Sequence, residues 1–333
     1  MGCGPRAPAA GPAPKPVLAP QSSGTTALLQ AVSAPSERVV WVSGHAAVVL
    51  RTRDGGSTWE RVSVSADTTL EFRDVEALDA NTAWVLAAGP GSRSRIYHTR
   101  DGGRTWSAQF VNRDSSAFYD CFAFWDAAHG IALSDGLLLR RTEDGGVHWP
   151  LLPDSILPRA QHGEGGFAAS GTCVTALAGR YAWVATGAAD TARVLATGDR
   201  GATWRTVAAP IPGGSFAGLA TVAFRDTAHG LVAGGNLGDA KGRDPNVAIS
   251  EDGGRTWTLS GRPPFPGPVY GAAYAGSSRT VAAAGPGGLA LSTDDGHSWT
   301  ALDTLAYWSV GFASGRVGWA VGPRGRIVQI RLP

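Results

Sequence analysis

The chain has 333 residues, of which 43% are hydrophobic, and it carries 29 basic and 27 acidic residues. A net charge of only +2 gives no broad field that would attract nucleic acid or an anionic membrane surface. No run of about 18 apolar residues occurs, so no membrane-spanning helix is predicted. The 46 glycines and 12 tryptophans favour a fold with many tight turns and large apolar anchors.

Residues 1–24 are rich in proline and alanine, which is typical of a solvated tether. Cys3, which opens this segment, resembles the lipidated cysteine of a bacterial lipoprotein after its signal has been removed. No charged and apolar signal precedes it, so two interpretations stay open: a misassigned start codon, or an incidental cysteine. A misassigned start codon would predict a protein outside the cytoplasm, in the periplasm or cell envelope or secreted, that is lipid-anchored through Cys3.

One octet of the form Ser/Thr-x-Asp-x-Gly-x-Thr-Trp, known as the Asp box or BNR repeat, recurs six times along the chain. Its tryptophans are 42 to 55 residues apart, which is the length that one four-stranded propeller blade needs. The aspartate and tryptophan that recur in every octet are Asp54 and Trp59, Asp101 and Trp106, Asp144 and Trp149, Asp199 and Trp204, Asp252 and Trp257, and Asp294 and Trp299.

Each octet has the composition of a tight hairpin turn. The aspartate carboxylate can accept hydrogen bonds from turn N–H groups, and the glycines supply positive φ angles. The tryptophan then buries between neighbouring strands. Because the turns repeat once per blade on the outer rim, we expect their carboxylates to point apart. The octets therefore predict a structural role and neither a metal site nor acid–base chemistry.

A pair of short apolar segments precedes each octet, and one further pair follows the last octet. The first segments of these pairs start near Leu28, Val75, Phe122, Val174, Val222, Ala272 and Val310. Alternating apolar residues of this kind indicate inner blade strands. His129 and His229 occupy equivalent turns in two separate pairs, so we interpret them as turn residues and not as a catalytic pair.

The seventh blade ends one strand short, because the chain stops shortly after Ile330. We predict that residues 17–21 supply the missing outer strand, which leaves the ring without an open edge. The predicted fold is all-β: a seven-bladed β-propeller over residues 25–333, closed by an N-terminal strand.

Long connections on the face opposite the octets are the candidate binding region, because loops on a rigid scaffold commonly carry function. We predict that they rim the mouth of the central channel with mixed polar and aromatic groups. An alternative stays open, in which they are solvated loops without a ligand. The candidate residues are Arg93 and Arg95 in the second blade; Arg159, His162 and Glu164 in residues 151–170; Asn236, Lys241 and Arg243 in residues 234–246; and Phe265 and Tyr270 in residues 262–270.

Cys121 and Cys173 fall at similar positions of adjacent blades. A disulfide could form there in an oxidising compartment, but the sequence favours two buried thiols. No metal-type cysteine spacing, phosphate loop, nucleophile elbow or dinucleotide fingerprint is present, so no cofactor, metal or catalytic residue is predicted.

The octets, together with the segment Gly318-Trp319-Ala-Val-Gly322, resemble the Asp-box propellers related to the photosystem II stability/assembly factor. Residues 164–172 and 234–246 resemble a bacterial branch of that group whose members are often labelled oxidoreductases, a label that no dinucleotide motif supports here. The resemblance covers residues 25–333. It implies a binding scaffold that acts outside the cytoplasm. We expect a monomeric, non-catalytic protein that binds a protein partner in a membrane or envelope complex.

A glycoside hydrolase of the sialidase or xyloglucanase type is the alternative, because such enzymes also carry Asp boxes. That reading implies a carbohydrate ligand and paired carboxylates. Glu164, Asp239 and Asp244 are the candidates. The arginine-containing element that sialidases carry early in the chain is not found.

Overall fold

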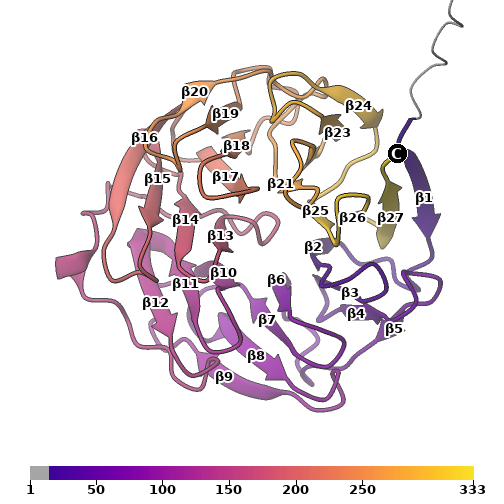
Figure 1. Ribbon diagram of the computed structural model, residues 1–333. Helices are drawn as coiled ribbons and strands as arrows, with labels where there is room; N and C mark the ends of the chain where they lie inside the picture. Colours follow the sequence, from indigo (N-terminus) through magenta and orange to yellow (C-terminus); the bar gives the residue numbers. More distant parts are fainter. Residues whose placement is uncertain (1–14) are drawn as a thin grey trace, which may run out of the picture.

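The computed structural model describes residues 15–333, so Cys3 and most of the predicted tether lie outside the described part. Strands β1 to β27 form seven antiparallel sheets that are arranged as blades around a common axis (Figure 1). The predicted fold class, an all-β propeller of seven blades, is therefore confirmed.

In blades 1 to 6 consecutive strands follow one another outward from the axis, whereas blade 7 takes its outer strand from the N-terminal end of the described chain. Blades 1 and 2 contain β2 (Leu29–Ser33), β3 (Val40–Gly44), β4 (Val49–Thr52) and β5 (Glu60–Arg61), then β6 (Phe72–Ala77), β7 (Ala83–Ala87), β8 (Arg95–Thr99) and β9 (Ser107–Val111). Blades 3 and 4 contain β10 (Tyr119–Phe124), β11 (Gly130–Ser134) and β12 (Leu138–Thr142), then β13 (Val174–Leu177), β14 (Tyr181–Ala185), β15 (Thr191–Thr197) and β16 (Arg205–Pro212).

Blades 5 and 6 contain β17 (Ala217–Phe224), β18 (Gly230–Asn236), β19 (Val247–Ser250) and β20 (Thr258–Leu259), then β21 (Gly271–Tyr274), β22 (Val281–Gly285), β23 (Gly288–Ser292) and β24 (Thr300–Asp303). Blade 7 contains β25 (Ser309–Phe312), β26 (Val317–Gly322), β27 (Arg326–Arg331) and β1 (Val17–Gln21). Three short 3₁₀ turns, η1 (Gly91–Arg93), η2 (Asp135–Leu137) and η3 (Asp154–Ile156), lie in the connections.

The hydrophobic core lies between neighbouring blades. Trp183 of blade 4 stacks on Phe224 of blade 5 with ring centroids 3.6 Å apart, and Trp84 of blade 2 stacks on Phe124 of blade 3 at 4.1 Å. Each of these aromatic pairs joins two blades. Because neighbouring blades cover both faces of a sheet, the second strand of each blade is almost wholly apolar.

The ring closes through β1, as the strand count predicts. This strand pairs antiparallel with β27, from Val17 opposite Arg331 to Gln21 opposite Ile327, and Figure 1 shows the two strands side by side. The side chain of Gln21 then joins the closing strand to the first octet, because its Nε2 donates to the carbonyl of Gly55 at 2.9 Å.

Blade 3 departs from the prediction of four strands in every blade. Its sheet has only β10, β11 and β12, and an isolated bridge between Arg140 and Leu151 stands where the outer strand would begin. Pro150 and Pro153 flank this short segment, and proline has no N–H to donate to a ladder. The outer strand of this blade is therefore reduced to a single bridge.

The first octet shows how the aspartates are used. Asp54 Oδ1 accepts the Thr58 N–H at 2.9 Å, and Oδ2 accepts the Thr58 hydroxyl at 2.7 Å. The hydroxyl of Thr52 donates to Asp54 Oδ1 and accepts the Gly56 N–H, each at 2.8 Å. The hydrogen bonds from Thr58 and Thr52 lower the pKa of Asp54 to about 2.

Candidate functional site

The two faces of the ring carry different connections. The octet turns and the turns between first and second strands lie on one face, which we call the octet face. The turns between second and third strands and the links between blades lie on the other, which we call the loop face. This division follows from the antiparallel order of the strands within each blade.

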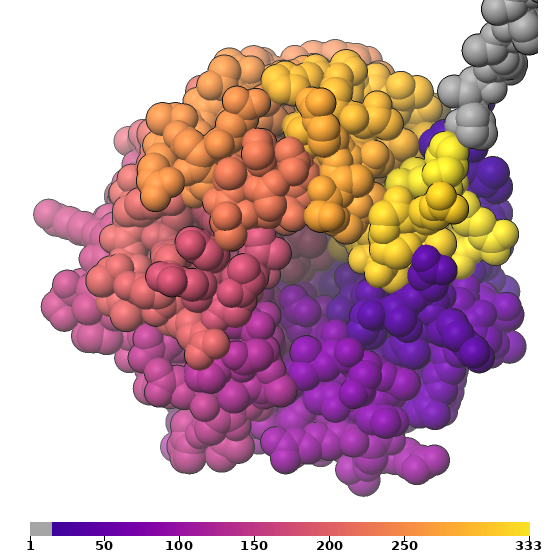
Figure 2. All heavy atoms as spheres, viewed as in Figure 1, coloured from indigo at the N-terminus to yellow at the C-terminus, as the bar shows by residue number. Residues whose placement is uncertain are grey.

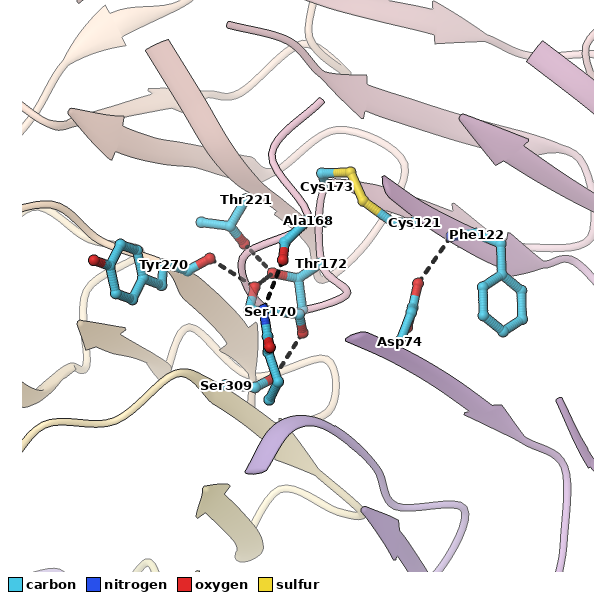
Figure 3. The surroundings of a disulfide bond; sticks show 11 residues. Asp74, Cys121, Phe122, Ala168, Ser170, Thr172, Cys173, Thr221, Tyr270 and Ser309 are labelled. Carbon is cyan, nitrogen blue, oxygen red and sulfur yellow. Dashed lines mark hydrogen bonds between the residues drawn. A yellow bond between two sulfur atoms is a disulfide. The ribbon is translucent and has the colours of Figure 1, made fainter. Parts of the chain in front are cut away.

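A segment of the connection before β13 crosses the loop-face mouth of the channel. We call residues 164–172 the plug. Gln30 of blade 1 donates its Nε2 to the carbonyl of Ala168 at 2.7 Å, and the hydroxyl of Ser309 in blade 7 donates to the carbonyl of Ser170 at 3.0 Å. The plug therefore reaches blades on the far side of the ring, as Figure 3 shows.

Two further hydrogen bonds hold the plug to blades 5 and 6. The hydroxyl of Ser170 donates to the carbonyl of Tyr270 at 2.6 Å, and the hydroxyls of Thr172 and Thr221 lie 2.8 Å apart (Figure 3). A Cβ atom at Gly171 would lie 2.4 Å from Asp74 Oδ1 on β6, so this close approach requires glycine. The channel is closed at the loop face by the chain itself.

A disulfide joins Cys121 on β10 to Cys173, which directly follows the plug (Figure 3). Both cysteines are fully buried, and their Cα atoms are 6.1 Å apart, within the range that a disulfide needs. The interpretation of two buried thiols is therefore wrong. The first strands of blades converge toward the axis, and this brings the two positions close enough to bond.

Glu164, the first residue of the plug, is buried and not exposed at the rim. Its exposed fraction is 0%, and its two carboxylate oxygens accept Nε and Nη2 of Arg193 at 2.6 and 2.5 Å. Oε1 also accepts the Thr186 hydroxyl, and Oε2 accepts the Gln161 N–H. Burial alone would raise the pKa of Glu164, but these hydrogen bonds outweigh it and hold the pKa below its ordinary value. The expectation of Glu164 as a rim ligand or hydrolytic carboxylate is corrected accordingly.

The candidates in the second blade and in the first long loop lie on the loop face. Arg93 donates to the carbonyl of Thr69 at 2.7 Å, and Arg95 donates to the carbonyl of Ser92 at 2.5 Å. Arg159 and His162 are exposed in the connection before the plug. The structure leaves these side chains at the surface and does not gather them into one pocket.

The second and third loops pack together. Arg243 Nη1 lies 3.5 Å from the carbonyl of Pro264, and Asn236 and Lys241 are exposed in the same loop as Arg243. Phe265 is only 5% exposed and serves the core between blades 5 and 6, which corrects its prediction as a surface ligand.

Tyr270 is half-buried beside the plug, with its ring 4.9 Å from that of Trp308. Sequence reasoning did not identify Trp308, which lies directly before β25 as Tyr270 lies before β21. It also missed Phe216, which is 70% exposed before β17. The carbonyl of Phe216 accepts a hydrogen bond from the Leu237 N–H at 2.8 Å. Phe216 therefore lies beside the loop that contains Asn236 and Lys241.

Below the plug, the ring encloses a cavity of about 360 Å³ lined by residues of β2, β6, β13, β17, β21 and β25 and by the plug residues Ser170, Gly171 and Thr172. Figure 2 shows the molecule hollowed at its centre. The charged residues among those lining it are Asp74 and Glu76, both on β6. A signal for them existed in the sequence, because three charged residues, Arg73, Asp74 and Glu76, are unusual in an inner blade strand.

The two carboxyl groups have unusual protonation. Burial, and then the nearby Glu76, raise the pKa of Asp74 well above its ordinary value, although Asp74 Oδ2 accepts the Phe122 N–H at 2.8 Å. Burial raises the pKa of Glu76 to about 7. Within the described residues, no group of three or more His, Cys, Asp or Glu side chains is arranged to hold a metal ion, and no helix has the length and hydropathy of a membrane span.

The fold and its octets define a seven-bladed Asp-box β-propeller. Residues 17–120 match the family model described as photosynthesis system II assembly factor YCF48. The structure of YCF48 bound to a D1 peptide is 19% identical with a TM-score of 0.67, covering 96% of this chain and 95% of that one. YCF48 from Cyanidioschyzon merolae is 17% identical with a TM-score of 0.67, covering 94% and 98%. The predicted resemblance to photosystem II assembly factor-like propellers is confirmed.

A glycoside hydrolase also shares the fold. The GH74 xyloglucanase from Xanthomonas campestris is 14% identical with a TM-score of 0.63, and the alignment covers 94% of this chain but 53% of that one. At this identity the likeness concerns the fold alone. No curated protein matches the chain.

Proposed function

We propose that this chain is a non-catalytic, monomeric scaffold outside the cytoplasm that binds a protein partner, in the manner of an assembly or stability factor. The observation that carries the proposal is the likeness, over 96% of the chain, to a propeller whose structure holds a bound peptide. The partner class we favour is a subunit of a membrane or envelope complex.

The loop face supplies a surface suited to such a partner. Phe216 is 70% exposed, and Asn236, Lys241 and Arg243 lie in the adjoining loop. An aromatic anchor beside polar and cationic groups is the composition that protein-binding hot spots favour. The β16, β17 and β18 strands that support this surface are 7 or 8 residues long, so it stands on extended and well-paired strands.

The disulfide between Cys121 and Cys173 supports a location outside the cytoplasm, because such bonds persist in oxidising compartments and are rare in the cytosol. Lipidation of Cys3 would then tether the propeller to a membrane. Detergent partitioning of the mature protein and mass spectrometry of its N-terminal peptide test this part, and an unmodified Cys3 in the native protein contradicts it.

The scaffold proposal is tested by capture from the membrane fraction of the native organism, followed by a reciprocal binding measurement with the purified partner. We expect Phe216→Ala combined with Lys241→Glu to weaken binding at least about tenfold. Val147→Ala is the matched control, because Val147 is 54% exposed in an octet on the other face. Equal affinity of the wild type and the loop-face variant for every captured partner would contradict the proposed surface.

The hydrolase alternative rests on the shared fold with the Xanthomonas xyloglucanase. Glu164 is bonded to Arg193 and sealed from solvent, which leaves Asp239 and Asp244 as the exposed carboxylates of that hypothesis. Hydrolysis of xyloglucan or of chromogenic glycosides that disappears in the Asp239→Asn, Asp244→Asn double variant would favour an enzyme over a scaffold.

A further inference from the structure

The cavity in the channel is closed at one end and reached from the other. The plug residues Ser170, Gly171 and Thr172 form its floor on the loop-face side. Its lining also includes Pro35 and Gly276, which lie in the turns between first and second strands on the octet face. A ligand would therefore enter from the octet face, opposite the surface proposed for the partner above.

The charges in this cavity are unbalanced. Among the described residues that line it, Asp74 and Glu76 are the acidic groups, and the lining contains no lysine, arginine or histidine that could balance their ionised forms. Asp74 is 3% exposed and accepts one backbone N–H, whereas Glu76 is partly exposed and has no side-chain hydrogen bond or ion pair within residues 15–333. An unpaired carboxylate in such a site is costly, and a cation would relieve that cost.

The depth of the carboxylates suits a long side chain. Glu76 is the next-to-last residue of β6, close to the octet face, and Asp74 lies about 7 Å deeper at roughly 3.3 Å per residue. Val32, Val222 and Val310 belong to the same lining and offer apolar surface around the entry. A lysine side chain, with an apolar stem and a terminal ammonium group, matches this combination.

We propose that the central cavity is a binding site for the lysine side chain of a protein partner, inserted from the octet face and held by Glu76 and Asp74. This site deepens the proposed scaffold function and rests on it. The ammonium group donates hydrogen bonds to the Glu76 carboxylate, and the hydroxyls of Ser33 and Thr175, which also line the cavity, can accept the remaining donors.

The site has a pH signature. The groups that line the cavity with Glu76 are Asp74 on the same strand and Tyr274 on β21, while the lining residues of β2, β13, β17 and β25 carry no charge. Burial raises the pKa of Glu76 to about 7, so its carboxyl group is mostly protonated at pH 6 and mostly ionised at pH 8. An ammonium ligand needs the ionised form, and its affinity rises roughly tenfold between these pH values.

The test is calorimetric and NMR titration of the full chain with Nα-acetyl-lysine N-methylamide, with the norleucine analogue as the neutral probe. We expect millimolar or tighter binding of the lysine probe, shifts of the β6 amide resonances, and a loss of at least about tenfold in Glu76→Gln. Glu251→Gln is the matched control, because Glu251 is exposed in an octet on the same face and lacks a side-chain partner within the described residues. Its affinity should equal that of the wild type.

Several outcomes would overturn the site: no binding of the lysine probe at millimolar concentration, equal binding of the norleucine probe, equal losses in Glu76→Gln and Glu251→Gln, or an affinity independent of pH. Asp74→Asn, which keeps an acceptor for the Phe122 N–H, provides a second variant. Failure here leaves the scaffold proposal standing, because the Phe216 and Lys241 variants test the other face.

Discussion

Arg200 in the fourth octet lies against Asp126 in the turn of the preceding blade, with its Nη2 3.2 Å from Asp126 Oδ2. Four octets have glycine at the equivalent position, with φ between 71° and 76°, whereas Arg200 adopts φ 59°. The sixth octet repeats the arrangement, because Asp295 has φ 62° and bonds to Arg225 of the preceding blade at 2.7 Å. Both exceptions to glycine thus use their side chains to join blades.

The two exceptions should respond differently to glycine. Arg200 and Asp126 are each about 40% exposed, so their ion pair contributes little, and Arg200→Gly removes a left-handed residue that costs about 1 kcal/mol. We expect it to change the free energy of unfolding by less than about 0.5 kcal/mol. Asp295→Gly gains the same backbone relief, but we expect a net loss of about 1 kcal/mol, because Arg225 is only 14% exposed and loses a partner. Urea denaturation of the two variants checks the contrast, and equal losses would contradict it.

The disulfide should stabilise both the ring and the plug. Cys121 and Cys173 are 52 residues apart, and closing a loop of that size contributes about 4 kcal/mol in the chain-entropy model. We expect the Cys121→Ser, Cys173→Ser double variant to unfold at lower urea and its plug amides to exchange faster by mass spectrometry. A Cys3→Ser background removes the third cysteine from the thiol count. Two free thiols in that background protein would contradict the bond.

Most of the architecture could be predicted from local repeats in the sequence, whereas the long-range contacts could not. The octets, the seven strand pairs and the closing strand follow from periodicity and from counting strands. The plug could not be predicted, because the bond from Gln30 to Ala168 joins residues 138 positions apart, and only the closed ring brings them together. The same convergence pairs Cys121 with Cys173, and it turns Asp74 and Glu76, two residues of an inner strand, into the lining of a cavity.

Two N-terminal truncations test how much the closing strand β1 contributes to stability. Removing residues 1–24 deletes β1 and leaves the edge of β27 unpaired, whereas removing residues 1–14 leaves the pairing from Val17 to Gln21 intact. We expect the longer deletion to lower the melting temperature by about 5 °C or more, and the shorter one to leave it unchanged. Equal melting of both truncated proteins would show that the ring does not depend on β1.

Within the closing strand, Gln21 should carry part of this effect. Its Oε1 accepts the indole N–H groups of Trp59 and Trp319 at 3.2 Å, and its Nε2 donates to the carbonyl of Gly55. Gln21→Ala leaves the buried indole N–H of Trp319 and the partly buried one of Trp59 without a partner, and we expect a loss of about 1 to 3 kcal/mol in the free energy of unfolding. Gln21→Glu keeps an acceptor for both indoles but turns a carboxylate oxygen toward the Gly55 carbonyl, so it should also be destabilising. A loss below about 0.5 kcal/mol in Gln21→Ala would contradict this assignment.

Glu76 in the cavity and the octet aspartates should make the stability of the protein depend on pH in opposite directions. The pKa of Asp54 is lowered to about 2, so its contribution is present above the unfolded value near 4 and is lost as the pH falls toward 2. The pKa of Glu76 is raised to about 7, so its contribution is present below the unfolded value and is lost as the pH rises through 7. We expect the wild type to melt at a lower temperature at pH 8 than at pH 6, and Glu76→Gln to reduce that difference, whereas Glu251→Gln should leave it as it is. An unchanged difference in Glu76→Gln would mean that this carboxyl group is solvated in the folded protein, and it would remove the electrostatic basis of the lysine site as well.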